Sequence, residues 1–318
     1  MILITGGLGF IGSNTAEALA KMGKSCVLTM HRNNYIPMFL EAYMGKTLFV
    51  EPVDILDTES LMAVGNKYPI SQIIHLGSAA IGAMDIAEEF RANINGFLNV
   101  TEAGRAWNVS RIIVASTIGV YDVDSRVPLQ EDEKLHLESM NSIPASKKSY
   151  EILGGVISAK TGLDMVFARI GAIWGPRGRA RSVFFAAPQL IHAAVRGGAL
   201  LNEMKTEKIY AGEAIDLCYV KDCGYGLALL ATTEKLNHRI YNLGSGKLTT
   251  NRQVVDAIAE VIPEVAFQLE DGTRPNQQAN GFYFDIQRLQ DDTYDESQYD
   301  IRGGMPDYIR WLQDGNEK

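Results

Sequence analysis

Cysteine is scarce in this chain of 318 residues, which has only Cys26, Cys218 and Cys223. Three cysteines at these spacings do not form a disulfide framework, and no histidine lies near them at metal-ligand spacing. The formal net charge is -8, and no cluster of lysine and arginine is dense enough to collect several phosphates. These absences favour a reducing compartment, and they argue against a metal site and a nucleic-acid partner.

Long apolar runs are also missing, since no window approaches the roughly 20 apolar residues of a membrane span. The chain opens on the strand-like run MILITGG. It therefore lacks the basic segment, apolar stretch and small-residue cleavage site of a secretion signal. We expect a cytoplasmic protein that does not enter a membrane. A hydrophobic content of 46% with 21% charged residues is typical of globular domains.

Short β-rich runs alternate with helical patterns along the first half of the chain. The predicted strands are 2–5, 25–30, 47–50, 71–76, 111–116 and 162–171. The predicted helices are 10–22, 57–67, 85–106 and 144–161. Strands and helices that alternate at this spacing form βαβ units, so we predict an α/β fold with a doubly wound parallel sheet of the Rossmann type.

The second half of the chain is less regular. A helix and a strand between 218 and 246 are expected to return to the main sheet. We therefore predict a dinucleotide-binding domain of residues 1–171 plus 216–246. A smaller, interleaved C-terminal substrate lobe would consist of residues 172–215 plus 247–318.

The run TGGLGFIG lies between the first predicted strand and the first helix. Its glycines have a GxxGxxG spacing, which allows a tight turn and a close approach of backbone N–H groups to a pyrophosphate. A simple strand-to-helix turn is the alternative explanation. We predict that this loop binds a dinucleotide through Gly6, Gly9, Phe10, Ile11 and Gly12.

The end of the second strand should distinguish NAD from NADP. An acidic residue there would accept hydrogen bonds from the adenosine ribose, whereas a basic residue would pair with a 2′-phosphate. This chain has Met30 at the acidic position, followed by His31 and Arg32. The pattern favours NADP over NAD, unless Arg32 is only a solvated surface charge.

Two further segments should lie along the cofactor. Asp54 and Ile55 follow the third strand, where the Asp54 carboxylate could accept a hydrogen bond from the adenine amino group or could instead cap a turn. Gly77 and Ser78 end the fourth strand, and their small side chains suit a backbone that runs close to a ligand. His75 lies inside that strand and is expected to be a core residue.

The ordered motifs resemble those of the extended short-chain dehydrogenase/reductases, also called NAD-dependent epimerase/dehydratases, many of which act on nucleotide sugars. The resemblance covers nearly the whole chain. Its motifs are TGGLGFIG, VDILD, NINGFLNVTEA, STIGVY, ASKKSYE, RIGAIWGPRG, DLCYVKD and YNLGSG.

This resemblance implies a catalytic site built from a Ser or Thr after the fifth strand, a tyrosine, and a lysine four residues after that tyrosine. Thr117 and Lys147 match the first and third positions, and Lys147 would also bind the nicotinamide ribose. Ile143 takes the place of the tyrosine. No tyrosine in the chain has a lysine four residues later. Tyr121 resembles a family residue that is usually structural.

The resemblance also indicates a small-molecule substrate, such as a nucleotide sugar. Arg274 matches a phosphate-binding arginine of the family, and we predict that Arg177 also binds the substrate. Arg179 and Arg181 add positive charge to the same loop as Arg177. Ile215 stands where nucleotide-sugar members commonly have another arginine, which weakens the phosphate prediction.

Two functions are compatible with these residues. The first is an NAD(P)-dependent oxidoreductase or epimerase with an altered site, in which a proton passes through water, Lys147 or a residue of the C-terminal lobe. The second is a non-catalytic NAD(P)-binding sensor or assembly subunit, which would need the glycine loop and Lys147 but no tyrosine. By analogy with the family we expect a homodimer, formed through 85–106 and 144–161.

Overall fold

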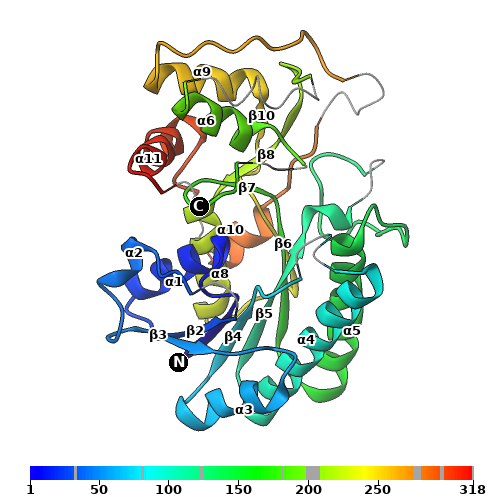
Figure 1. The fold of residues 1–318 in the computed structure, drawn as a ribbon. Coiled ribbons are helices and arrows are strands. Elements are labelled where there is room, and N and C mark those ends of the chain that lie inside the picture. The colour runs from blue at the N-terminus through cyan, green and yellow to red at the C-terminus, as the bar shows by residue number, and fades with distance from the viewer. Residues whose placement is uncertain are drawn as a thin grey trace.

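The computed structural model describes residues 1–31, 34–79, 82, 84–121, 125–180, 182, 184–197, 208–274, 281–293 and 297–316. Its main sheet has seven parallel strands in the order β3-β2-β1-β4-β5-β6-β9 (Figure 1). These strands are β1 (Ile2–Thr5), β2 (Cys26–Met30), β3 (Leu48–Pro52), β4 (Gln72–His75), β5 (Arg111–Thr117), β6 (Met165–Ile170) and β9 (Ile240–Leu243). The prediction of a doubly wound parallel sheet is confirmed.

Helices cover both faces of this sheet (Figure 1). One face carries α1 (Phe10–Lys21), α2 (Met38–Glu41), α8 (Val220–Thr232) and α10 (Gln287–Thr293). The other face carries α3 (Thr58–Lys67), α4 (Ile86–Ala106) and α5 (Ser142–Thr161). Successive strand residues point to opposite faces, so Ile4 packs in the core beneath α1 and Leu3 in the core beneath α4.

A second, three-stranded sheet lies beyond the carboxyl ends of the main strands (Figure 1). It contains β7 (Ala172–Trp174), β8 (Ala214–Tyr219) and β10 (Leu248–Thr250). In this sheet β7 runs parallel to β8, whereas β10 runs antiparallel to it. The helices α6 (Ala187–Val195), α9 (Asn251–Val261) and α11 (Ile301–Gln313) pack with it around a separate apolar core.

Side-chain caps fix the ends of the helix that carries Lys147. Asn141 precedes α5, and its Oδ1 accepts a hydrogen bond from the Ile143 amide at 3.0 Å, so the helix begins two residues before the predicted start. Gly162 ends the helix in the left-handed region at φ 75°. Within the described part of the chain, no helix combines the length and apolar character of a membrane span.

Candidate functional site

The glycine loop between β1 and α1 is a tight turn that leads directly into the helix. Gly6 has φ 67°, and a Cβ on Gly12 would lie 2.3 Å from the Gly6 carbonyl oxygen, so neither position accepts a larger residue without movement. The Gly9 amide donates back to Gly6 O at 2.9 Å. The amides of Phe10, Ile11 and Gly12 have no acceptor among the described residues. Free amides at the start of a helix form an anion-binding site.

The predicted adenosine-binding residues meet beside the ends of β2 and β3. The His31 imidazole Nε2 lies 3.6 Å from Asp54 Oδ2, and both side chains are about half exposed. Ile55 lies against the segment after β4, because a Cβ on Gly77 would sit 3.3 Å from Ile55 Cδ1. Arg32, on which the NADP prediction mainly depends, lies outside the described residues.

Thr5 organises the end of β4. Its Oγ1 accepts hydrogen bonds from the amides of Leu76 and Gly77 at 3.2 and 3.1 Å, and it lies 2.7 Å from His75 Nδ1. Because both lone pairs of the hydroxyl are used, Thr5 donates its proton to Nδ1. The neutral His75 ring then carries its own proton on Nε2, which is buried without a partner among the described residues.

Lys147 is a buried cation that has no anionic partner in the described part of the chain. Its side chain is 5% exposed, and its ammonium lies 4.7 Å from the centroid of the Tyr150 ring. It forms no hydrogen bond or ion pair with any described residue. Burial lowers the pKa of Lys147 to about 8. Burial together with the charge of Lys147 lowers the pKa of His75 to about 3.

Thr117 lies beside the start of the same helix. Its Oγ1 accepts from the Gly119 amide at 3.2 Å and caps a single 3-10 turn, η1 (Ile118–Val120), which leaves the hydroxyl proton available for donation. A Cβ on Gly119 would lie 3.4 Å from Pro144 and 3.6 Å from Thr117 Oγ1, so the first turn of α5 passes close to Thr117. Ile143, in that turn, is half-buried and offers no hydroxyl.

Sequence reasoning missed two polar pairs that join α4 to α5. Ser142 donates to Glu89 Oε2 at 2.6 Å, and one turn further along both helices Asn93 Nδ2 reaches Ser146 Oγ at 3.5 Å. Asn93 Oδ1 also accepts from Ser78 Oγ at 3.2 Å, which joins the segment after β4 to α4. The only signal in the sequence is the four-residue spacing of polar residues on otherwise apolar helix faces.

A second buried cation, Arg169, is fully paired. Its Nη2 lies 2.7 Å from Glu151 Oε2 and its Nε 3.0 Å from Oε1. Its Nη1 donates to the hydroxyl of Tyr121 at 2.9 Å, and that hydroxyl donates to Asn242 Oδ1 at 2.7 Å. Ser116 donates to Glu151 Oε1 at 2.5 Å. The buried charges of Arg169 and Glu151 therefore compensate each other.

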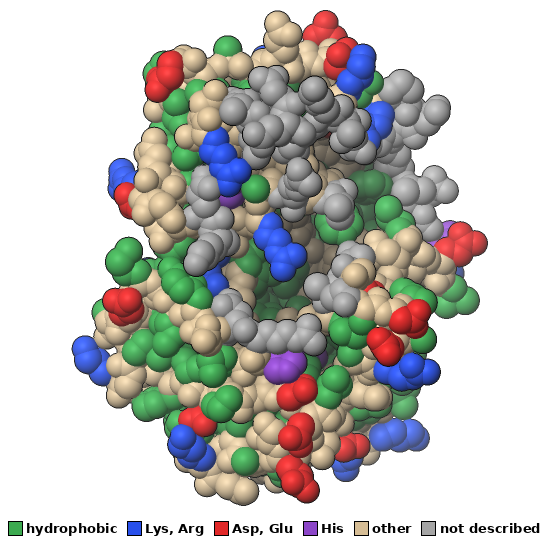
Figure 2. Space-filling view, viewed as in Figure 1, with side chains coloured by type: hydrophobic (Ala, Val, Ile, Leu, Met, Phe, Trp, Pro, Cys, Tyr) green, Lys and Arg blue, Asp and Glu red, His purple; other side chains and the backbone are tan. Residues whose placement is uncertain are grey.

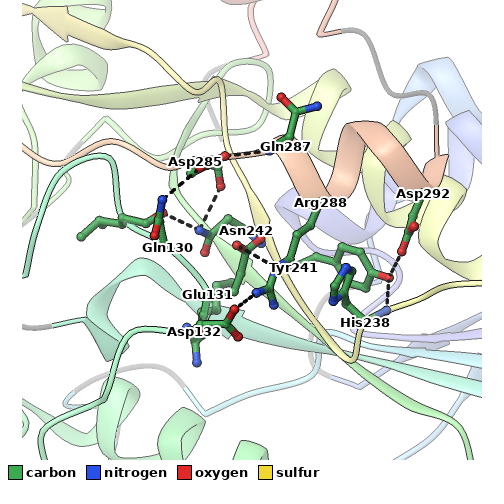
Figure 3. Close-up of polar contacts among 12 residues, drawn as sticks. Gln130, Glu131, Asp132, His238, Tyr241, Asn242, Asp285, Gln287, Arg288 and Asp292 are labelled. Carbon is green, nitrogen blue, oxygen red and sulfur yellow. Dashed lines mark hydrogen bonds and ion pairs between the residues drawn. The ribbon is translucent and has the colours of Figure 1, made fainter.

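The network continues to the segment before and within α10 (Figure 3). The backbone N–H of Asn242 donates to Glu131 Oε1 at 2.9 Å. The side-chain Nδ2 of the same residue donates to the backbone carbonyl oxygen of Asp285 at 3.1 Å. Arg288 on α10 pairs with Glu131 at 3.5 Å and also with Asp132. These contacts fix the last strand of the main sheet to residues 281–293.

The structure does not bring the two predicted substrate arginines into one cluster. Arg177 Nη1 donates to the Leu8 carbonyl oxygen of the glycine loop at 2.9 Å. Arg274 instead pairs with Glu213, with 3.3 Å between Nε and Oε1. Arg179 is exposed, and Arg181 lies outside the described residues. Figure 2 shows Lys and Arg side chains along the hollow that crosses the middle of this face.

The arrangement fits a dinucleotide. The glycine loop offers three amide donors to a pyrophosphate, and the buried Lys147 ammonium offers hydrogen bonds that no described residue accepts. Thr117 adds a hydroxyl near the start of α5. The glycine loop follows β1, Thr117 ends β5, and Lys147 lies in the first half of the helix after β5. These groups therefore lie near the carboxyl ends of parallel strands, where ligands of such sheets bind.

Sequence comparison agrees with this geometry. A sequence model of the NAD dependent epimerase/dehydratase family matches residues 2–244. The chain is 28% identical over 276 residues to a UDP-glucuronate 4-epimerase of Thermodesulfobacterium geofontis. That alignment covers 83% of this chain and 81% of the relative.

Solved structures share the fold along the full chain. The UDP-glucose 4-epimerase of Thermotoga maritima with UDP-glucose has a TM-score of 0.81 at 20% identity, with 99% of each chain covered. The UDP-glucose 4-epimerase of Bifidobacterium longum in complex with NAD+ and UDP has a TM-score of 0.81 at 19% identity. That comparison covers 100% of this chain and 99% of the other. At these identities the likeness establishes the fold.

Proposed function

Because the chain belongs to the NAD-dependent epimerase/dehydratase family, we propose that it is an enzyme that oxidises and epimerises the sugar of a nucleotide sugar. The observation that carries the proposal is Lys147, a buried ammonium that no described carboxylate or carbonyl satisfies. Unpaired buried charge is costly, and such groups with a shifted pKa cluster at functional sites. The 28% identical UDP-glucuronate 4-epimerase supports a UDP-hexuronate as the first substrate to test.

The residues that would hold the dinucleotide are those of the glycine loop, together with Asp54 and Lys147. A bound nicotinamide supplies a reversible hydride acceptor. The preference for NADP over NAD remains a prediction that rests on His31 and Arg32. It is tested by the ratio of the two affinities in wild type and in Arg32→Ala, and an unchanged ratio would contradict it.

The proton chemistry must proceed without a tyrosine if Ile143 occupies the tyrosine position. We assign the two remaining roles to Thr117 and Lys147. The Thr117 hydroxyl donates a hydrogen bond to the reacting sugar oxygen, and the neutral amine of Lys147 takes the proton that leaves this oxygen. An amine with a pKa of about 8 is partly deprotonated near neutral pH, so Lys147 can act without a phenolate between it and the substrate.

Two proposals concern the assembly of the enzyme. Residues 1–171 plus 216–246 would bind the dinucleotide, and residues 172–215 plus 247–318 would bind the substrate.

A homodimer would form through α4 and α5, because α5 exposes 60% of Ile152 and 59% of Val156 on its outer face. Val156→Asp should then convert a dimer into a monomer in sedimentation experiments, and an unchanged mass would contradict the dimer.

The enzyme proposal is tested by incubating the wild type with NAD or NADP and a panel of UDP-sugars. The nicotinamide absorbance near 340 nm and the sugar products would be followed together. Inversion at one sugar carbon without net reduction of the cofactor is the expected result. Tight cofactor binding with no turnover of any sugar would instead support the non-catalytic sensor.

A further inference from the structure

Arg177 reaches from the loop after β7 to the glycine loop after β1. Its Nη1 donates to the Leu8 carbonyl oxygen at 2.9 Å and reaches Gly9 O at 3.5 Å. The guanidinium carbon lies 5.6 Å from the centroid of the Tyr35 ring, which belongs to the loop after β2. Three loops from different parts of the chain therefore meet at one half-buried guanidinium.

No anion balances this guanidinium within the described part of the chain. Arg177 pairs with no described Asp or Glu, and its Nε and Nη2 donate to no described acceptor. It lies at the start of α1, where the helix dipole and the free amides of the glycine loop already produce a positive potential. The two positive groups repel one another, and an anion bound between them would offset this repulsion.

The backbone of Arg177 is strained. Its φ is 72°, and Asn108 is the only other described residue besides glycine with a positive φ. A residue with a Cβ adopts this conformation only where the surrounding structure holds it there. The following Gly178 helps to hold it, because its amide donates to Gly175 O at 2.9 Å. The loop after β7 thus holds Arg177 in a strained conformation in which its guanidinium contacts the glycine loop.

We propose that Arg177 binds the diphosphate of the dinucleotide and closes the glycine loop from the side of the smaller sheet. The planar guanidinium keeps Nε and Nη2 for a two-pronged contact with phosphate oxygens, a geometry that arginine favours. This inference rests on the proposed function, and it replaces the substrate role predicted for Arg177. An epimerase must return its hydride to the molecule from which it came, so a contact that slows release of the reduced cofactor serves that reaction.

The test compares ligands that differ in their phosphates. Binding of NAD, ADP-ribose, adenosine and UDP would be measured by calorimetry or by competition for wild type, Arg177→Ala and Arg177→Lys. Arg302→Ala is the matched control, because Arg302 is exposed and pairs with Glu260 on the distant helix α9. We expect Arg177→Ala to weaken NAD and ADP-ribose by about 10- to 100-fold, as for lost hydrogen bonds to a charged group, and to leave adenosine and UDP unchanged. Arg177→Lys should lie between.

The variant Arg177→Gly keeps the test valid if Arg177→Ala folds poorly, since glycine accepts φ 72° without strain. It should melt no lower than wild type without ligand, yet lose the same affinity for ADP-ribose. Equal affinities of Arg177→Gly and Arg302→Ala for ADP-ribose would overturn the inference. Loss of UDP binding alone would also overturn it, because Arg177 would then be a substrate residue. If wild type itself bound neither NAD nor ADP-ribose, the proposed function would fail as well.

Discussion

Two cations are buried at the carboxyl end of the main sheet, and the chain treats them differently. Arg169 is 2% exposed and pairs with both oxygens of Glu151 and with the hydroxyl of Tyr121. Lys147 is 5% exposed; its ammonium lies over the Tyr150 ring and forms no hydrogen bond or ion pair with a described residue. Burial of a charge costs free energy unless partners compensate it. The chain provides these partners where a cation supports the fold, and it leaves them out where we propose that a ligand supplies them.

Breaking the paired site should have the largest effect. Glu151→Gln removes the negative charge that compensates the buried Arg169 guanidinium. Loss of one partner of a buried ion pair typically destabilises the folded protein by about 3 to 5 kcal/mol. We expect a lower free energy of unfolding by that amount, measured by urea denaturation monitored by circular dichroism. Glu102→Gln, at an exposed position on α4, is the control and should stay near wild type. A loss below about 1 kcal/mol in Glu151→Gln would show that the pair is not structural.

Removing the unpaired cation should have the opposite effect on stability. The pKa of Lys147 falls from 10.5 to about 8 on folding, so the unfolded chain binds more protons between these values and stability rises with pH across that window. Below pH 8 the full penalty remains, and Lys147→Met should stabilise the ligand-free protein there by up to about 3 kcal/mol. The same variant should lose about 10² to 10⁴ in turnover.

Lys147→Arg separates charge from proton transfer, because arginine keeps the cation but does not release its proton. It should therefore retain more dinucleotide affinity than Lys147→Met while turnover stays low. Destabilisation by Lys147→Met in the absence of ligand would contradict the comparison between the two cations.

The pH dependence of turnover should report the unpaired cation as well. If the neutral amine of Lys147 accepts the proton, kcat/KM falls about tenfold for each pH unit below about 8 and levels off above it. Ile143→Tyr is expected to shift the pH at which kcat/KM begins to fall, because the introduced phenol would share the proton with Lys147. A profile that is flat from pH 6 to 9 in wild type would rule out Lys147 as the proton acceptor.

His75 should give the smallest effect. Its pKa falls from 6.5 to about 3 on folding, through burial first and then the charge of Lys147, so the unfolded chain binds more protons between these values. Stability is therefore lost as the pH falls from 6.5 toward 3, by about 2 kcal/mol at pH 5. Unfolding titrations at pH 5 and 7 should show a smaller difference for His75→Gln than for wild type. An equal difference would contradict the assignment.

The sequence predicted the parts of the molecule that depend on local pattern. The strands of the main sheet up to β6 and the helices α1, α3, α4 and α5 follow from apolar periodicity, which is read within a few residues. The glycine loop is equally local, since three glycines between a strand and a helix specify a close backbone approach. The roles predicted for the individual site residues remain predictions that the experiments above test.

The rest of the site depends on how distant segments meet. Glu89 and Ser142 form a pair because of the rotation of α4 and α5 about their axes, which composition does not encode. The contact of Arg177 with the glycine loop depends on a positive φ at this residue, which is unusual for arginine and was not predicted. The short strands β7 and β10 each have only three residues, too few for a periodicity to be recognised.

The strand order sets when this sheet can close during synthesis. α8, from residues 220–232, covers α1, and β9, from residues 240–243, pairs with β6 on the far side of a long intervening segment. A nascent chain that has emerged only as far as β6 therefore exposes both an unpaired strand edge and the apolar face that α8 will cover. Such species are prone to aggregation until the non-local contacts form. The interleaved order of the two sheets thus makes this protein a candidate for protection by chaperones while it is being translated.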